Sequence, residues 1–196
     1  FRSVLGHHED AVRYAQMAEQ VRTAFDRVFF DEKAQSCGPN GDNIFALCMG
    51  LGAEHQPQLI NTVRKEIAEG TKGHVNVGFI GAKYFFETLA RHGMNDLAYE
   101  AMNKTDFPSY GHWIAQGATT TWEQWDGGNS RNHPMMGSGL TWFSRNLAGV
   151  QYDEHQPAYR HIIIRPQVPA QMESVSYTKQ TPYGKVATSL QRKDGI

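Results

Sequence analysis

The sequence lacks several features that mark common functional classes. Its two cysteines, Cys37 and Cys48, are too few for a disulfide framework and do not have zinc-type spacing. No apolar run approaches the length of a membrane-spanning helix. The net charge is only −1, so we expect no nucleic-acid partner and no membrane partner. No phosphate-binding loop, dinucleotide fingerprint or Ser-His-Asp pattern is present.

The periodicity of the apolar residues changes along the chain. Apolar residues recur at three- and four-residue steps in the first three quarters, and they predict helices over residues 8–30, 44–51, 57–70, 79–90, 95–102, 120–125 and 134–147. Residues 105–115 are expected to be irregular. Short alternating or β-branched segments predict strands over residues 159–165, 172–178 and 184–190. We therefore predict a mainly α fold with a β tail, divided into domains 1–152 and 153–196.

The stretch from Gln116 to Gly139 has the residue types of a sugar-binding site. Trp122 and Trp125 flank Glu123, and aromatic rings stack on the C–H face of a sugar while a carboxylate meets its hydroxyls. A carboxylate among aromatic rings is partly desolvated, which suits it for proton transfer. An inverting glycosidase needs two carboxyl groups on opposite faces of the sugar. Glu123 is our candidate for the general base.

Neighbouring polar and aromatic side chains are candidates for substrate binding. Asp126 follows Glu123 at the spacing of one helical turn, which would place it on a similar face, and it could orient the water or a hydroxyl. His133 could donate a hydrogen bond to a sugar hydroxyl. The candidate walls of the site are aromatic: Trp122, Trp125, Trp113 and Tyr110.

Each of these residues also has a purely structural interpretation. Thr120 and Glu123 have the spacing of a helix capping box, in which the glutamate reaches back to the N-cap amide. Either tryptophan could simply be core. Asp126 precedes two glycines, as turn residues often do. His133 precedes a proline and could be a cap or a buried, hydrogen-bonded histidine.

Four blocks of the sequence resemble one enzyme family. They are GATTTWEQWD, NHPMMGSGLTWFSRNLAGV, HIIIRPQ and TPYGKV, and in this order they resemble the C-terminal half of bacterial α-L-rhamnosidases of glycoside hydrolase family 78. The segment HVNVGFIGAKYFFETLARHGMNDLAYEAM resembles the helical hairpin that precedes the first block. The resemblance covers nearly the whole chain.

This resemblance implies a fold, a reaction and roles for two residues. The fold is part of an (α/α)₆ toroid followed by part of an antiparallel β-sandwich. The reaction is hydrolysis of terminal α-L-rhamnosides with inversion, which needs no cofactor or metal, and the partners are rhamnose-containing glycosides. Glu123 corresponds to the family's general base, and His133 to a histidine that contacts the sugar. The family's general acid lies in an upstream motif that these residues do not contain.

Other functions remain open at this point. A different (α/α)₆ sugar hydrolase or a phosphorylase would share the fold, although a phosphorylase needs a phosphate site. An inactive carbohydrate-binding remnant is an alternative from another class, since the chain is expected to be a fragment that lacks the acid. Such a fragment would expose apolar helix faces, so self-association is expected.

Overall fold

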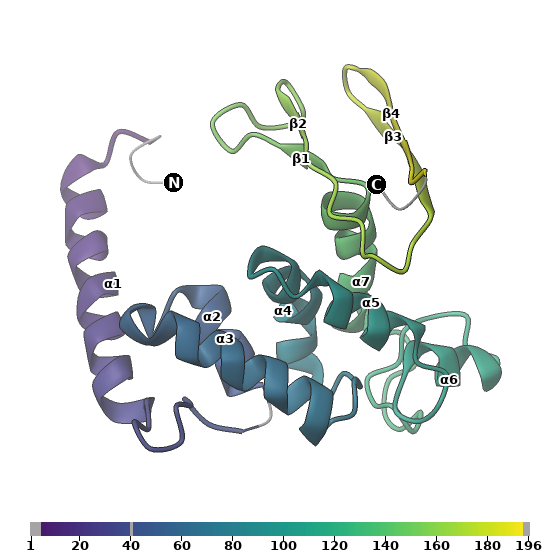
Figure 1. The fold of residues 1–196 in the computed structure, drawn as a ribbon. Helices are drawn as coiled ribbons and strands as arrows, with labels where there is room; N and C mark the ends of the chain where they lie inside the picture. Colours follow the sequence, from purple (N-terminus) through teal and green to yellow (C-terminus); the bar gives the residue numbers. More distant parts are fainter. Residues whose placement is uncertain (1–4, 40, 194–196) are drawn as a thin grey trace. The chain divides into compact units, whose positions relative to one another are not determined.

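The computed structural model describes residues 5–39 and 41–193. The chain divides into two compact units, residues 1–63 and 64–196. The predicted fold class is confirmed, because helices form most of the first three quarters and short antiparallel strands follow them (Figure 1).

The first unit contains α1 (His8–Phe29), α2 (Asp42–Met49), a 3₁₀ turn (Ala53–His55) and most of α3 (Gln56–Lys65). None of the α1 residues is buried, although the apolar positions of this helix recur at helical spacing. The α2 helix ends at Gly50, which has a left-handed backbone conformation with a φ of +65°.

The helices of the second unit form the core that supports the candidate site. They are α4 (Gly78–Arg91), α5 (Asn95–Asn103), α6 (Tyr110–Ala115) and α7 (Ser138–Trp142), and α4 packs against both α5 and α7. A π-helical turn (Glu66–Gly70) continues α3. A 3₁₀ turn (Pro134–Gly137) leads into α7, and a second π-helical turn (Phe143–Leu147) follows it. Phe86 and Trp142 are fully buried between these elements, with ring centroids 5.8 Å apart.

The strands of the second unit form two separate antiparallel pairs. In the first pair, β1 (Val150–Tyr152) lies beside β2 (Ile162–Ile164), with Val150 opposite Ile164. The second pair is a hairpin of β3 (Ser174–Thr181) and β4 (Gly184–Gln191), joined by a two-residue turn. Exposure alternates along both hairpin strands, as the period-2 sequence pattern predicts.

Most of the predicted elements are confirmed to within a few residues. The exceptions are informative. Residues 110–115 form α6 where an irregular segment was expected, and β1 was not predicted. The helix predicted over residues 120–125 is wrong, because these residues lie in a long loop. The domain boundary at 152/153 stays a prediction; β1 precedes it and pairs with β2 beyond it.

Gly149 sits at the change from helix to strand and leaves no room for a side chain. Its φ is +70°, and a Cβ at this position would lie 2.2 Å from the backbone nitrogen of Pro166. We expect Gly149→Ala to lower the free energy of unfolding by at least about 2 kcal/mol, because it adds backbone strain to a clash with main-chain atoms.

Thermal or denaturant unfolding measures this cost, with Gly70→Ala as the control. Gly70 has open space where a Cβ would lie, and the same substitution there should change stability by less than about 1 kcal/mol. Equal stability of the two variants would contradict the close approach at Gly149.

Candidate functional site

Residues 117–133 form a loop whose two limbs run side by side and hydrogen-bond to each other. The backbone N–H of Glu123 donates to the carbonyl of Ser130 at 2.8 Å, and the N–H of His133 donates to the carbonyl of Thr121 at 2.8 Å. The Thr121 hydroxyl also donates to the carbonyl of His133, at 2.8 Å. The limb that carries Glu123 is thus fastened to the limb that carries His133.

Arg131 strengthens this pairing with contacts to both limbs. Its guanidinium lies 4.7 Å from the centre of the Trp122 ring, and its Nε donates to the carbonyl of Gly127 at 3.2 Å. Its own carbonyl accepts a hydrogen bond from the Thr120 hydroxyl. Gly127 has a φ of +83°, and a Cβ there would lie 2.9 Å from the Trp122 ring. A cation over an aromatic face contributes about 0.5–1 kcal/mol at an exposed position.

Glu123 and His133 meet across the loop. Glu123 Oε2 lies 3.7 Å from His133 Nδ1, and the side chains are 26% and 22% exposed. The N–H of Ser130 donates to the same carboxylate oxygen at 3.3 Å. The Phe79 ring, from the first turn of α4, packs edge-on against the imidazole with centroids 5.4 Å apart. The carboxylate is therefore oriented but still accessible to solvent.

His133 has a polar atom without a partner. Its Nε2 is buried and makes no hydrogen bond with the described residues. An unsatisfied buried nitrogen costs about 1–3 kcal/mol, which is a reason to expect a polar group of a ligand or a water to meet it. The carboxylate of Glu123 and the imidazole of His133 together can contact a water and a hydroxyl group.

The capping-box interpretation of Glu123 does not hold in the structure. No helix starts at Thr120, and its hydroxyl donates to the carbonyl of Arg131 on the other limb. The expectation that Asp126 shares a helix face with Glu123 is wrong for the same reason. Asp126 is exposed, and its Oδ1 accepts the N–H of Gly128 at 2.9 Å, which closes a local turn.

The other predicted wall residues form an aromatic cluster, consisting of Tyr110, Trp113, Trp122 and Trp125. Trp113 is buried, and its Nε1 donates to the carbonyl of Trp125 at 2.9 Å. Trp122 is only 6% exposed. The Tyr110 hydroxyl donates to the carbonyl of Met136 at 2.6 Å, and burial raises the pKa of Tyr110 above its ordinary value. The cluster packs beneath the loop.

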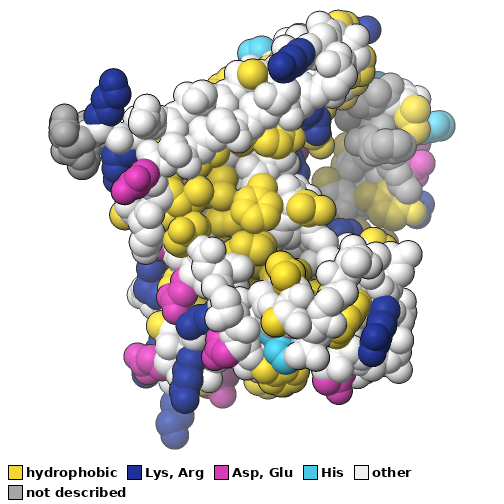
Figure 2. Space-filling model, turned by 90° about the vertical axis from the view of Figure 1, so that its right-hand side faces the viewer, with side chains coloured by type: hydrophobic (Ala, Val, Ile, Leu, Met, Phe, Trp, Pro, Cys, Tyr) yellow, Lys and Arg dark blue, Asp and Glu magenta, His cyan; other side chains and the backbone are white. Residues whose placement is uncertain are grey.

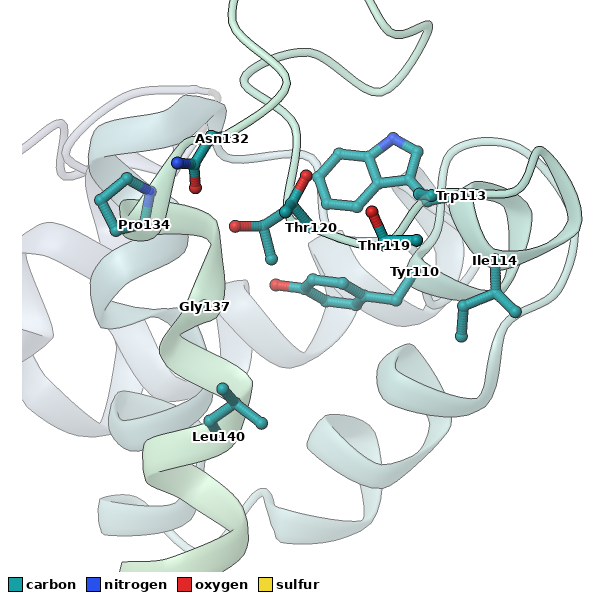
Figure 3. Close-up of a pocket in the computed structure, with 11 residues that line it drawn as sticks. Tyr110, Trp113, Ile114, Thr119, Thr120, Asn132, Pro134, Gly137 and Leu140 are labelled. Atoms are coloured by element: carbon teal, nitrogen blue, oxygen red, sulfur yellow. The ribbon is translucent and has the colours of Figure 1, made fainter.

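A cavity of about 560 Å³ lies beside the aromatic cluster (Figure 3). In Figure 3, Tyr110 and Trp113 form one wall. Across from them lie Pro134, in the 3₁₀ turn before α7, and Leu140, in α7 itself. Its other lining residues are Ile114, Ala118, Thr119, Thr120, Thr121, Asn132 and Gly137. Neither Glu123 nor His133 is among the described residues that line it. Glu123 and His133 therefore lie together outside the lining of the cavity that Tyr110 and Trp113 help to form, and a shared substrate site stays a prediction.

Apolar side chains gather on the face shown in Figure 2. Among the described large hydrophobic residues of the second unit, Leu140 and Ile114 are the most exposed, at 72% and 71%, and both line the cavity. Among the described residues, no helix is long and apolar enough to cross a membrane. The same residues contain no group of three or more histidine, cysteine, aspartate or glutamate side chains placed to hold a metal.

The sequence analysis did not identify the residues that position Glu123 and His133. Ser130 and Arg131 belong to a polar, glycine-rich segment that is typical of a solvated turn, and Phe79 was assigned only to a helix. Thr121 was read as part of a helix start. A usable signal was the polar alternation of Thr121 and Glu123 around Trp122, which is typical of an extended strand with one buried face.

Trp122 should be important for the stability of the loop. We expect Trp122→Ala to lower the free energy of unfolding by about 3–5 kcal/mol, because it removes a buried ring together with the surface on which Arg131 lies. Denaturant unfolding is the measurement. Tyr183→Ala, at an aromatic residue that is mostly exposed, is the control and should cost less than about 1 kcal/mol. A loss at Trp122 as small as the control's would show that the ring does not support the loop.

Comparison with known protein families gives matches along almost the whole chain. Residues 2–147 match the bacterial α-L-rhamnosidase 6 hairpin glycosidase domain, and residues 149–196 match the bacterial α-L-rhamnosidase C-terminal domain. An α-L-rhamnosidase from Alteromonas sp. is 29% identical over 94% of this chain and 21% of its own length. One from Streptomyces avermitilis is 29% identical over 95% of this chain and 19% of its own length.

Solved structures agree with these matches. The crystal structure of Streptomyces avermitilis α-L-rhamnosidase complexed with L-rhamnose superposes with a TM-score of 0.87, at 28% identity, over 99% of this chain and 20% of the other. The structure of the α-L-rhamnosidase from Dictyoglumus thermophilum gives a TM-score of 0.88, at 29% identity, over 98% of this chain and 22% of the other. The chain spans about a fifth of the length of the relatives it matches.

Proposed function

Because this chain belongs to the bacterial α-L-rhamnosidase family, we propose that it provides the general-base side of an active site that hydrolyses terminal α-L-rhamnosides. One observation carries the proposal. The accessible carboxylate of Glu123 lies 3.7 Å from the imidazole of His133, and the buried Nε2 of this imidazole has no hydrogen-bond partner among the described residues. The relatives are named α-L-rhamnosidases, which supports a rhamnose-containing glycoside as the substrate.

Glu123 is proposed to take a proton from the attacking water. Its Oε2 accepts from the N–H of Ser130, while Oε1 makes no hydrogen bond with the described residues. As the water oxygen bonds to the anomeric carbon, its proton passes to the Glu123 carboxylate and the bond to the leaving oxygen breaks. A positioned general base of this kind contributes about 10²–10⁴-fold to the rate. The attack from the face opposite the leaving group gives inversion.

His133 is proposed to bind a sugar hydroxyl through Nε2. The Phe79 ring packs edge-on against the imidazole, which limits how far the imidazole can turn. At 3.7 Å, Nδ1 is too far from the Glu123 carboxylate for a normal hydrogen bond, and the carboxylate keeps its capacity to accept a proton from water.

The leaving oxygen needs a proton from a second carboxyl group. The Asp126 carboxylate is engaged in its own turn with Gly128, and we assign it no role as the acid. We propose that the general acid comes from the part of the family's length that these 196 residues do not span. Trp122 and Trp113 are buried in the aromatic cluster and support the loop by packing, and their contacts with substrate stay a prediction.

Glu123→Gln should lower kcat/KM for a chromogenic aryl α-L-rhamnoside by about 10³-fold, because glutamine cannot accept the proton from water. The complete gene product is assayed, since the relatives are about five times as long as this chain. Glu173→Gln, at an exposed glutamate of the β region, is the matched control and should leave the rate unchanged. A fully active Glu123→Gln enzyme would show that Glu123 is not the base.

His133→Ala should weaken substrate binding more than it slows turnover. Loss of the Nε2 contact to a hydroxyl is expected to raise KM, and the inhibition constant of free L-rhamnose, by roughly tenfold. Steady-state kinetics with L-rhamnose as a product inhibitor measures both. His155→Ala, in an exposed turn, is the control. An unchanged inhibition constant would remove His133 from the sugar site.

A further inference from the structure

Glu123 and His133 are not placed by a helix. They lie on the two limbs of the loop 117–133, ten residues apart in sequence, and contacts between the limbs hold their backbones together. A misplacement of about 1 Å in a catalytic group can cost 10²-fold in rate. The residues that fasten the limbs together are therefore candidates for a role in the reaction.

We propose that Thr121 is the positioning residue for the Glu123–His133 pair, an inference that rests on the function proposed above. Thr121 is the residue that holds His133 by both of its backbone groups. The Thr121 carbonyl accepts the N–H of His133 at 2.8 Å, and the Thr121 hydroxyl donates to the carbonyl of His133 at 2.8 Å. Two bonds to one residue fix its orientation as well as its distance.

The position of Thr121 couples this bond pair to the carboxylate. Two residues later, the Glu123 N–H donates to the carbonyl of Ser130, and the Ser130 N–H donates back to Glu123 Oε2. The Glu123–His133 contact is thus bracketed by the Thr121 bonds on one side and the Ser130 bonds on the other. Without the Thr121 hydroxyl, the N–H of His133 still donates to Thr121 and its carbonyl still accepts the N–H of Met136, so only one hydrogen bond ties His133 to the opposite limb.

The neighbouring threonines provide comparisons within the same segment. The Thr120 hydroxyl also crosses the loop, but it reaches the carbonyl of Arg131 and not the histidine. The Thr119 side chain makes no hydrogen bond with the described residues. The Thr→Val change replaces a hydroxyl by a methyl group of similar size at both positions. At position 121 it removes the hydrogen bond to His133, whereas at position 119 it removes no hydrogen bond with the described residues.

The test uses Thr121→Val, Thr121→Ser and Thr119→Val in the complete gene product. We expect Thr121→Val to lower kcat by roughly tenfold and to weaken product inhibition by L-rhamnose severalfold, because both Glu123 and His133 lose their relative placement. Thr121→Ser keeps the hydroxyl and should restore both values to within about twofold of the unchanged enzyme. Thr119→Val should match the unchanged enzyme.

A merely structural role would give a different result. It would lower the melting temperature and the yield of folded enzyme, and therefore Vmax, while the inhibition constant of L-rhamnose stayed the same. If Thr121→Val does not fold, Thr121→Cys offers a weaker donor of similar size and should give an intermediate kcat.

Besides this structural result, two further outcomes overturn the inference. One is a Thr121→Val enzyme with unchanged kcat and unchanged inhibition by L-rhamnose, while the Glu123→Gln enzyme is inactive in the same assay. That result would leave the proposed function in place and remove the positioning role of Thr121. The other is a Thr121→Cys enzyme with the full rate. An active Glu123→Gln enzyme would instead overturn the proposed function itself.

Discussion

The hydrogen bonds between the two limbs of the loop 117–133 are the constraint on which the candidate site depends. Glu123 and His133 both lie outside regular secondary structure, so no helix ladder or sheet ladder holds their backbones. The bonds from Glu123 to Ser130 and between Thr121 and His133 take the place of a ladder. They bring a carboxylate and an imidazole close together and leave the carboxylate accessible, an arrangement that suits a general base beside a sugar contact.

Burial of the aromatic cluster stabilises the loop that carries Glu123 and His133. An irregular loop has many backbone groups to satisfy and little apolar surface to bury. Trp122 and Trp113 bury large rings against each other, with centroids 5.8 Å apart, and Arg131 closes the outer face of Trp122. The loop is therefore anchored by its tryptophans while its polar residues remain at the surface. Packing of the two tryptophans therefore stabilises the loop that carries the candidate base.

Much of the fold could be predicted from the sequence, because apolar periodicity is a local signal. The helices α1 and α4 follow directly from it, and the β3–β4 hairpin follows from alternation. The candidate pair could be named from its residue types and from the family resemblance. Its geometry could not be predicted, because it depends on bonds between residues seven to twelve positions apart.

The wrong prediction at residues 120–125 shows how local signals fail. The spacing of Thr120 and Glu123 satisfies a capping box, yet both residues find their partners on the opposite limb, at Arg131 and Ser130. Long-range pairing overrides the local preference here. In the same way, the sequence around Tyr110 contains proline and glycine and suggested an irregular segment, but Ser109 caps α6 by accepting the N–H of His112.

We propose that Glu123 activates a water, so that the sugar never bonds to this carboxylate. Proton NMR of the first L-rhamnose released from an α-L-rhamnoside tests it most directly, before mutarotation mixes the anomers. If Glu123 is a general base, the β-anomer appears first, because the water attacks from the face opposite the leaving group. First release of the α-anomer would mean a covalent glycosyl-enzyme intermediate and would contradict the assignment of Glu123 as a general base.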